Sequence, residues 1–573
     1  MLWVEISHVN GDSQYAGGGA WRCPLTQVTG LGGPHPAVVP SAFMAEHVDW
    51  VVIGSGFGGS VSALRLAEKG YRVCVLEKGR RFAPEDFPRT NWDLRRWLWL
   101  PGLGLRGFFQ MSFLRHATIF HGVGVGGGSL TYANTLPQPT RAFFEAPSWA
   151  HLADWAAELA PHYATARRML GVTPVTVVTK GDEILREIAR DTGREADFSP
   201  TEVGVFFGEP DVSVPDPYFG GEGPDRAGCT HCGACMTGCR VGAKNTLDRN
   251  YLHLAERRGC RIEADTEVRA VRPRPQGGFR VETRRGRFGA PGTITADRVV
   301  FAGGVMGTLP LLLAMREDPE GLPRLSARLG HDVRTNSEAL LGVIAPDAGV
   351  DFSRGVAITS ILQTDEHSHV EPVRYGAGSG FFRLITLPHA PGASALGRIA
   401  GALRGFARQP RAWFRALTVR DFSRSSQILL YMRTLEGTMR MRLGRSLRSP
   451  FRRGLVTEID DPAHAPSAFM AEATELARRW AAKVHGVTAT MYTETLLGVP
   501  STAHVLGGCC MGADAAEGVI DRDHRVFGYD GLYVIDGAAV SANPGVNPAL
   551  TITALAERAM AKVPVKGGPA SGR

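Results

Sequence analysis

A short apolar stretch followed by a glycine-rich turn constrains this chain more than any other feature. The apolar run Trp50–Ile53 is followed at once by the turn Gly54–Gly59. The run predicts a buried strand, and the apolar spacing after the turn predicts a helix over 60–69 that packs back on that strand. A strand, a glycine turn and a helix in this order are typical of a dinucleotide-binding unit.

Each glycine of the turn has a physical role toward a pyrophosphate. Gly54 permits the tight turn, Gly56 lets backbone N–H groups approach the anion, and Gly59 lets helix and strand pack closely. The positive end of the helix faces the anion. The residues of this turn that we predict to contact the cofactor are Gly54, Gly56, Phe57, Gly58 and Gly59.

Glu77 supports the same interpretation because it ends a second predicted strand, 72–76. It lies roughly 20 residues beyond the turn, where an acid accepts both hydroxyls of an adenosine ribose. A carboxylate at this position disfavours a 2′-phosphate. The dinucleotide is therefore expected to be FAD or NAD.

A second glycine-rich run, Gly122–Gly128, holds five glycines in seven residues. Such a run does not form an ordinary helix, because glycine loses more conformational freedom on folding than any other residue. We expect its backbone to lie flat against a bulky planar or phosphorylated group.

Composition sets the class of protein. The chain has 573 residues, of which 44% are hydrophobic and 21% charged, which is ordinary for a globular protein with two or more domains. No window offers eighteen uninterrupted apolar residues, so no transmembrane segment is expected. The net charge of +8 is concentrated, since residues 393–453 contain 14 Arg against Asp421 and Glu436.

Part of this basic region alternates arginines with apolar residues over Leu396–Leu417, with an interruption at Pro410. The pattern has three interpretations: a packed helix with a solvated basic face, a peripheral contact with an anionic membrane through Arg398–Arg415, or a nucleic-acid surface. We expect no nucleic acid as a partner. The first two interpretations stay open.

Four of the nine cysteines crowd into eleven residues, at Cys229, Cys232, Cys235 and Cys239. Their spacing matches the bacterial ferredoxin run, although Arg240 stands where that run has proline and no second run follows. Soft thiolates at this spacing hold an iron-sulfur cluster or zinc. Metal-free structural or redox-reactive thiols are the third interpretation.

The first 43 residues lack a basic segment followed by an apolar one, so we expect no signal peptide. They are rich in Gly and Pro, and Met44 leads straight into the first predicted strand. We expect residues 1–43 to be disordered or a wrongly assigned extension, with Met44 as the start. A cytoplasmic protein, at most peripheral to a membrane, is expected.

Three motifs near the C-terminus complete the pattern. His504 opens His-Val-Leu-Gly-Gly, Asp536-Gly537 ends a predicted strand, and Asn547-Pro548 precedes a predicted helix. Together with the two glycine-rich runs, these motifs resemble the glucose-methanol-choline (GMC) oxidoreductases over most of residues 44–562. The run Gly124–Leu130, Gly-Val-Gly-Gly-Gly-Ser-Leu, is close to the cholesterol oxidase branch of that family.

The resemblance implies FAD as the cofactor and assigns further contacts to it. Val268 would meet adenine through its backbone, Asp536 and Gly537 would bind the ribityl and phosphate portion, and the helix opened by Pro548 would point at the flavin pyrimidine. The other contacts implied by the resemblance are Gly122, Gly127, Gly128, Ser129 and Asn134 along the flavin, and Gly303 after a buried strand.

The resemblance also implies a reaction. His504 would accept the hydroxyl proton of an alcohol while the carbinol hydrogen leaves as hydride for flavin N5, and Asn547 would orient the alcohol oxygen. We expect a hydrophobic alcohol such as a 3β-hydroxysteroid to be oxidised to the ketone. Two alternatives stay open: a lipid alcohol dehydrogenase that passes electrons through an iron-sulfur cluster, and a non-catalytic flavin-binding membrane-associated scaffold.

The expected fold is α/β, with a Rossmann-like FAD-binding domain interleaved with an α+β substrate domain. Polar and apolar residues alternate over 427–432 and 438–443, which predicts a mostly antiparallel sheet in the substrate domain. The expected FAD-binding parts are 44–140, 241–335 and 498–563; a substrate or lid segment with the cysteine loop spans 141–240, the substrate domain spans 336–497, and 564–573 form a tail.

Overall fold

The computed structural model of the chain describes residues 46–286, 289–346, 349–446 and 449–568. The expectation for residues 1–43 and the choice of Met44 as the start lie outside the described residues. Within the described ranges, no helix is long and apolar enough to cross a membrane.

The N-terminal dinucleotide-binding unit forms as predicted, around the central strand β1 (Glu46–Ile53). β1 pairs in parallel with β2 (Val73–Leu76) on one side and with β15 (Pro291–Phe301) on the other. Burial on both faces explains its continuous apolar run. The rest of this mixed sheet is parallel β12 (Arg261–Glu263) and β26 (Leu532–Val534), with antiparallel β13 (Thr266–Pro273) and β14 (Phe279–Arg285).

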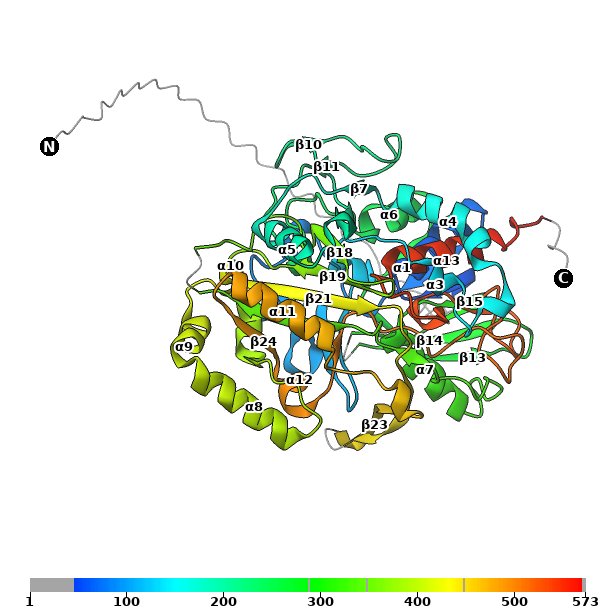
Figure 1. Cartoon of the computed structure of the whole chain (residues 1–573). Helices are drawn as coiled ribbons and strands as arrows, with labels where there is room; N and C mark the ends of the chain where they lie inside the picture. Colours follow the sequence, from blue (N-terminus) through cyan, green and yellow to red (C-terminus); the bar gives the residue numbers. More distant parts are fainter. Residues whose placement is uncertain (1–45, 287–288, 347–348, 447–448, 569–573) are drawn as a thin grey trace, which may run out of the picture. The chain divides into compact units, whose positions relative to one another are not determined.

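Helix α1 (Phe57–Glu68) follows the glycine turn and begins three residues before the predicted 60–69 helix. A Cβ atom at Gly59 would lie 2.0 Å from the Gly54 carbonyl oxygen, so helix and turn meet at a distance only glycine permits. α1 packs against α13 (Ala549–Ala561) and α6 (Tyr251–Arg257), and α13 packs against α4 (Trp155–Met169) (Figure 1).

A second, fully antiparallel sheet takes all of its strands but one from the C-terminal half, as the alternation predicted. Its outer face packs on α11 (Ala471–Lys483) and α5 (Lys180–Asp191), with α11 beside the long strand β21 in Figure 1. Val343 and Leu429 belong to that packed layer, whereas Leu340 and Leu430 line a cavity on the opposite face. The strand order is β20 (Thr386–Pro388), β24 (Val487–Met491), β17 (Ala339–Ile344), β21 (Ser426–Arg433), β19 (Ser368–Val373), β18 (Ser360–Gln363) and β8 (Phe198–Pro200).

The basic amphipathic segment folds as two helices, α8 (Ala395–Arg408) and α9 (Pro410–Thr418). Pro410 opens the second helix, where its missing N–H costs nothing. The remaining helices are α2 (Leu94–Trp97), α3 (Arg141–Phe144), α7 (Val305–Glu317), α10 (Phe422–Ser425) and α12 (Tyr492–Leu497). Smaller sheets use β3 (Trp99–Leu100), β4 (Leu105–Arg106), β5 (Phe109–Phe113), β6 (Thr118–Gly122), β7 (Val172–Pro174), β9 (Glu202–Gly204), β10 (Ser213–Val214), β11 (Arg226–Ala227), β16 (Val333–Arg334), β22 (Thr438–Ser446), β23 (Ser449–Glu458) and β25 (Ser501–Thr502).

The chain passes between the two large sheets repeatedly. The first sheet takes strands from residues 46–76, 261–301 and 532–534, and the antiparallel sheet takes strands from 198–200 and 339–491. The mixed α/β fold class is therefore confirmed. The exact domain boundaries given above stay a prediction.

We expect Gly59→Ala to lower the free energy of unfolding by about 1–3 kcal/mol, the usual cost of overpacking. The added methyl would meet the Gly54 carbonyl oxygen, which belongs to the backbone and cannot rotate away. Thermal unfolding monitored by flavin release measures the effect. Gly102→Ala is the control, because a Cβ there meets nothing within 4 Å. Equal melting temperatures for the two variants would contradict the packing argument.

Candidate functional site

A cavity of about 660 Å³ extends from the glycine turn after β1 to the inner face of the antiparallel sheet. Its first part lies at the carboxyl ends of β1 and β15, where open α/β sheets bind their ligands. The sequence-predicted residues that line it are Gly54, Gly56, Phe57, Gly58, Glu77, Gly122, Gly127, Gly128, Val268, Gly303, His504, Asp536, Gly537, Asn547 and Pro548.

The glycines along this cavity leave room for a bulky ligand. A Cβ atom added at Gly304 or Gly307 would meet no protein atom within 4 Å, and one at Gly56 would meet only the Ala302 carbonyl oxygen at 4.0 Å. Since all three residues line the cavity, the open space beside them belongs to the cavity. These residues therefore form a cradle suited to a ligand that lies against the backbone, such as a dinucleotide.

Three predicted contacts lie outside the cavity lining. Gly59 packs against the turn itself, as described above. The Ser129 hydroxyl donates to the Gly126 carbonyl oxygen at 2.7 Å and accepts from the Leu247 N–H at 3.0 Å, so it braces the glycine run from behind. Asn134 is buried behind the lining residue Ala133. Contact of these three residues with the cofactor stays a prediction.

Glu77 connects the two glycine-rich runs. Its carboxylate accepts hydrogen bonds from the Ser55 hydroxyl at 2.8 Å, the Gly79 N–H at 2.9 Å and the Gly124 N–H at 3.3 Å. Ser55 belongs to the first run and Gly124 to the second, so one buried carboxylate holds both against the cavity. It still lines the cavity where an adenosine ribose would lie.

Asp536 has a similar position at the far end of the same sheet. Its carboxylate accepts from the Thr308 hydroxyl at 2.6 Å, the Gly304 N–H at 2.8 Å and the Ala538 N–H at 2.7 Å. Burial raises the pKa of Asp536 to about 6, although these hydrogen bonds oppose the shift. The residue orders the loop after β15 around the cavity.

His504 is oriented by an acid that the sequence analysis did not identify. The Nδ1 atom lies 2.6 Å from the Glu338 carboxylate, which also accepts from the Ala503 N–H at 2.5 Å. Burial alone lowers the pKa of His504, but the charges of Glu338 and Glu371 outweigh it and the pKa is raised. With Nδ1 engaged, Nε2 is the nitrogen available to a ligand in the cavity.

Asn547 has its own buried acid, Glu371. With the amide oriented so that its nitrogen faces this carboxylate, it donates at 2.9 and 3.2 Å to the two oxygens. Glu371 lies on β19, whose six residues are all buried, and a single acid in such a strand is the signal that sequence reasoning missed. The contact fixes the Asn547 amide beside the cavity.

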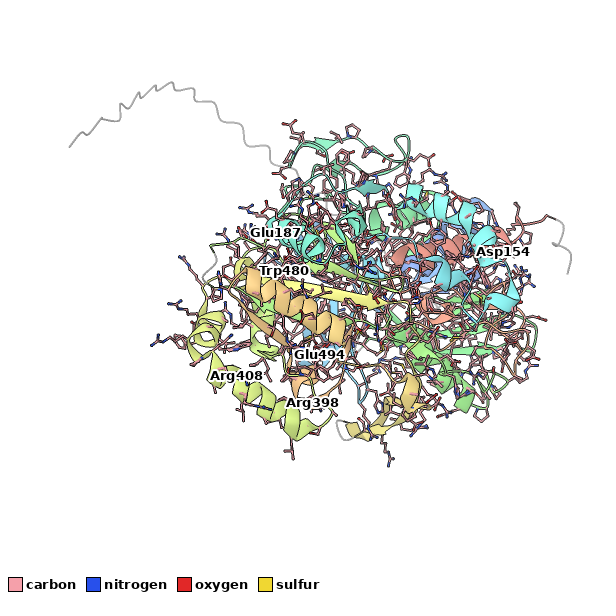
Figure 2. The ribbon with its side chains drawn as sticks, viewed as in Figure 1. Asp154, Glu187, Arg398, Arg408, Trp480 and Glu494 are labelled. Carbon is pink, nitrogen blue, oxygen red and sulfur yellow. The ribbon has the colours of Figure 1, made fainter. Side chains whose placement is uncertain are left out.

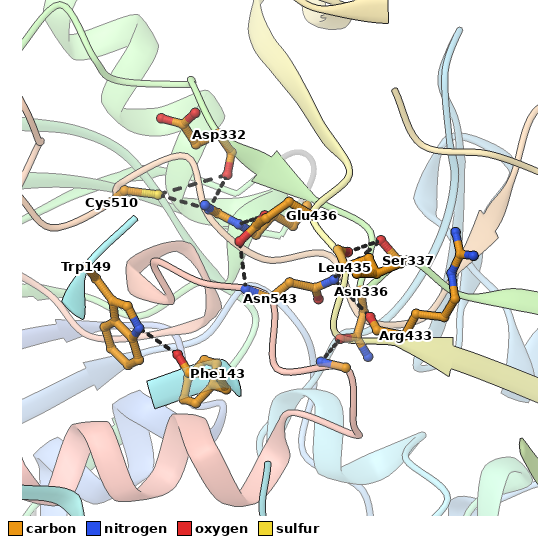
Figure 3. Close-up of polar contacts among 12 residues, drawn as sticks. Phe143, Trp149, Asp332, Asn336, Ser337, Arg433, Leu435, Glu436, Cys510 and Asn543 are labelled. Atoms are coloured by element: carbon orange, nitrogen blue, oxygen red, sulfur yellow. Dashed lines mark hydrogen bonds and ion pairs between the residues drawn. The ribbon is translucent and has the colours of Figure 1, made fainter. Parts of the chain in front are cut away.

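A polar network joins the loops that carry His504 and Asn547 (Figure 3). Arg334 donates to the Glu436 carboxylate at 2.7 Å, and the same carboxylate accepts from the Asn543 N–H at 3.2 Å. The backbone of Arg334 also pairs with that of Leu506, two residues after His504. Arg334 on β16 and Glu436 between β21 and β22 therefore connect the segment after His504 to the segment before Asn547.

Comparison with known proteins decides the family. A profile described as FAD dependent oxidoreductase matches residues 49–370, and one described as GMC oxidoreductase matches residues 456–556. The chain is 46% identical to a cholesterol oxidase of Mycobacterium tuberculosis H37Rv over 550 residues, which cover 91% of this chain and 92% of the relative. The chain belongs to the GMC oxidoreductases. FAD is therefore its cofactor, and oxidation of an alcohol is its class of reaction.

Two further matches agree with this membership. A cholesterol oxidase of Acinetobacter baumannii is 43% identical over 531 residues, 90% of this chain and 94% of the relative. The structure of pyridoxine 4-oxidase from Mesorbium loti superposes with a TM-score of 0.58 at 16% identity, covering 90% of this chain and 98% of that one. The structural match supports the fold alone.

In this GMC oxidoreductase none of the four clustered cysteines lines the flavin cavity. Cys229, Cys232, Cys235 and Cys239 line a second, small pocket together. Among the described residues, no group of three or more His, Cys, Asp or Glu side chains is arranged around a single metal ion. The four cysteines therefore stand outside the wall of the flavin cavity, although Met236 between them lines it.

We expect Glu338→Gln to move the acidic limb of flavin reduction by an alcohol to lower pH. A base acts when neutral, and the Glu338 charge raises the pKa of His504, so its removal lowers the pH at which the imidazole becomes neutral. Stopped-flow flavin reduction across pH measures the shift. Glu366→Gln, at an exposed acid, is the matched control. An unmoved acidic limb would show that Glu338 does not set the charge of His504.

Proposed function

We propose that this GMC oxidoreductase oxidises the hydroxyl of a sterol-like hydrophobic secondary alcohol to the ketone. The observation that carries the proposal is the second half of the cavity, which continues from His504 and Asn547 along the inner face of the antiparallel sheet. The two relatives described above, both cholesterol oxidases, support the same substrate class.

This second half of the cavity is strongly apolar. A ligand there would be enclosed by aliphatic and aromatic side chains, which favour burial of a rigid hydrocarbon over a sugar. His504 and Asn547 stand at one end, where the reacting hydroxyl would be held, and Ser426, Gln427 and Thr490 add polar groups to the wall. The apolar lining residues are Phe109, Phe120, Leu340, Ile344, Ile358, Phe382, Phe422, Leu430 and Met491.

The proton chemistry follows from the histidine. His504 Nε2 would accept the hydroxyl proton, and the Glu338 carboxylate at Nδ1 would hold the tautomer and stabilise the imidazolium that forms. Asn547, held by Glu371, would orient the alcohol oxygen. When bound, FAD supplies the acceptor for the hydride that leaves the carbinol carbon.

The two alternatives have weaker support. A long-chain-alcohol oxidase of Arabidopsis thaliana and a 2-methyl-1,2-propanediol dehydrogenase of Mycolicibacterium austroafricanum are 25% and 23% identical, well below the cholesterol oxidases. His504 and Glu338 form a buried pair. Burying a carboxylate costs stability that its partners must offset, so a non-catalytic scaffold would gain nothing from keeping this pair.

We also propose that the helix pair α8–α9 contacts an anionic membrane surface. Leu396, Leu403 and Phe414 are 80%, 62% and 70% exposed, whereas Trp413 and Ala416 face the core. The pair thus has a core-facing side, and these three outer residues lie on the opposite side. Exposed leucines beside arginines are typical of helices that lie in a lipid interface. Figure 2 labels Arg398 and Arg408 on α8.

The position of this helix pair suits delivery of a membrane-dissolved substrate. α8 packs against β20 and α12, and α9 packs against α10 and β24. Phe382 and Thr386, before the pair, and Phe422, after it, line the apolar part of the cavity. An apolar molecule that leaves a bilayer beneath the pair would thus have the cavity close by.

We expect His504→Ala to slow anaerobic flavin reduction by a sterol at least about a hundredfold, the scale of a general base. Stopped-flow absorbance with cholesterol in detergent micelles measures the rate. The control is His464→Ala, because His464 is exposed and pairs only with Asp461 nearby. Bleaching by long-chain alcohols but not by sterols would contradict the substrate assignment, and an unchanged rate would remove His504 from the chemistry.

We expect Leu403→Ser/Phe414→Ser to lose most binding to vesicles containing anionic lipid while keeping the rate with sterol in detergent. The two side chains supply much of the exposed apolar surface of the pair. Vesicle flotation measures binding. Val565→Ser is the control, because Val565 is 60% exposed near the C-terminus and outside the pair. Wild-type protein that stays in the soluble fraction would refute the membrane contact.

A further inference from the structure

The four thiols of Cys229, Cys232, Cys235 and Cys239 face one pocket. Cys229 is buried, Cys235 and Cys239 are partly exposed, and Cys232 is exposed. We propose that these cysteines bind an iron-sulfur cluster beside the flavin cavity. This proposal assumes that FAD is bound in the neighbouring cavity, and it does not depend on which alcohol the enzyme oxidises.

The arrangement of the thiols favours a cluster over a single ion. A tetrahedral zinc site needs every sulfur about 2.3 Å from one point, and the described residues hold no such group. A four-iron cluster instead takes each thiolate at a different iron atom, so its ligands stand farther apart around a shared space. The four cysteines have the spacing of the bacterial ferredoxin run and line one pocket, as ligands that share a cluster would.

The protein around the pocket complements a negative cluster. Lys244 is buried and lines the same pocket, and its ammonium donates to the Cys235 carbonyl oxygen at 2.8 Å and to no carboxylate among the described residues. A buried cation without a carboxylate partner favours a nearby anion. The backbone N–H of His231 donates to the Cys229 sulfur at 3.4 Å, the kind of hydrogen bond that tunes cluster potentials.

The remaining walls are apolar and firmly held. Val205, Val241 and Ala243 line the pocket and belong to one hydrophobic cluster with Cys229. The loop is tied down by a β-bridge between Cys232 and Gly355. A dry, rigid shell of this kind protects a cluster from solvent.

The pocket lies next to the flavin cavity. Met236 lines the flavin cavity, while its neighbour Cys235 lines the cysteine pocket. Lys244 joins the two sides, because its ammonium also donates to the carbonyl oxygen of Leu130 at the end of the glycine run. A cluster at this position can take electrons one at a time from reduced flavin.

The test starts with the wild-type holoenzyme purified without oxygen. We expect about four iron and four sulfide per chain for one cubane cluster, visible absorbance beyond that of flavin, and an electron paramagnetic resonance signal after dithionite reduction. Cys232→Ser and Cys239→Ser should lose iron, sulfide and the signal while retaining FAD. Cys260→Ser, at a buried cysteine outside the loop, is the matched control and should keep all three.

Two results would overturn the proposal: wild-type protein with full FAD but neither iron nor sulfide, or one zinc per chain in place of iron. The wild-type analysis decides even if a serine variant does not fold. Anaerobic bleaching by sterol in the same samples tests the proposed function separately, because it needs only FAD and the His504 site.

Discussion

The close approach of α1 to the end of β1 is the constraint on which the rest of the cofactor site depends. Gly59 lies so near the Gly54 carbonyl oxygen that any side chain would force helix and strand apart. This approach brings the positive end of α1 to the cavity. Glu77 then ties the second glycine-rich run to the first through Ser55 and Gly124, so both cofactor-contacting loops share one anchor.

The chemistry of the site depends on buried acids that act through other residues. Glu338 sets the tautomer and charge of His504, and Glu371 sets the orientation of Asn547. Both carboxylates are fully buried, and such groups persist only when hydrogen-bonded partners compensate their desolvation. Glu371 lies on β19, and Glu338 directly precedes β17 of the same antiparallel sheet. That sheet therefore supplies more than an apolar wall, because it also carries the acids that pair with His504 and Asn547.

The same sheet separates two environments. Its outer face packs on α5 and α11, whereas its inner face lines the substrate end of the cavity. Successive residues along β17 and β21 point to opposite faces of the sheet, as in any strand. They therefore alternate between packing on the helices and lining the cavity. At the edge of this sheet, α8 and α9 turn large apolar side chains outward, which packing alone would not favour.

The sequence by itself determined the dinucleotide-binding unit, the FAD family and the alternating strands of the substrate domain, because these depend on local glycine spacing and hydrophobic period. It also identified His504 and Asn547 by their motif context. Glu338 and Glu371 were missed, since they lie 166 and 176 residues away in the chain and only tertiary pairing brings them to the site. Tertiary structure also decided that the Ser129 hydroxyl bonds back to the glycine run, that Leu396 and Leu403 face outward, and that four cysteines line one pocket, because side-chain direction depends on what packs against each element.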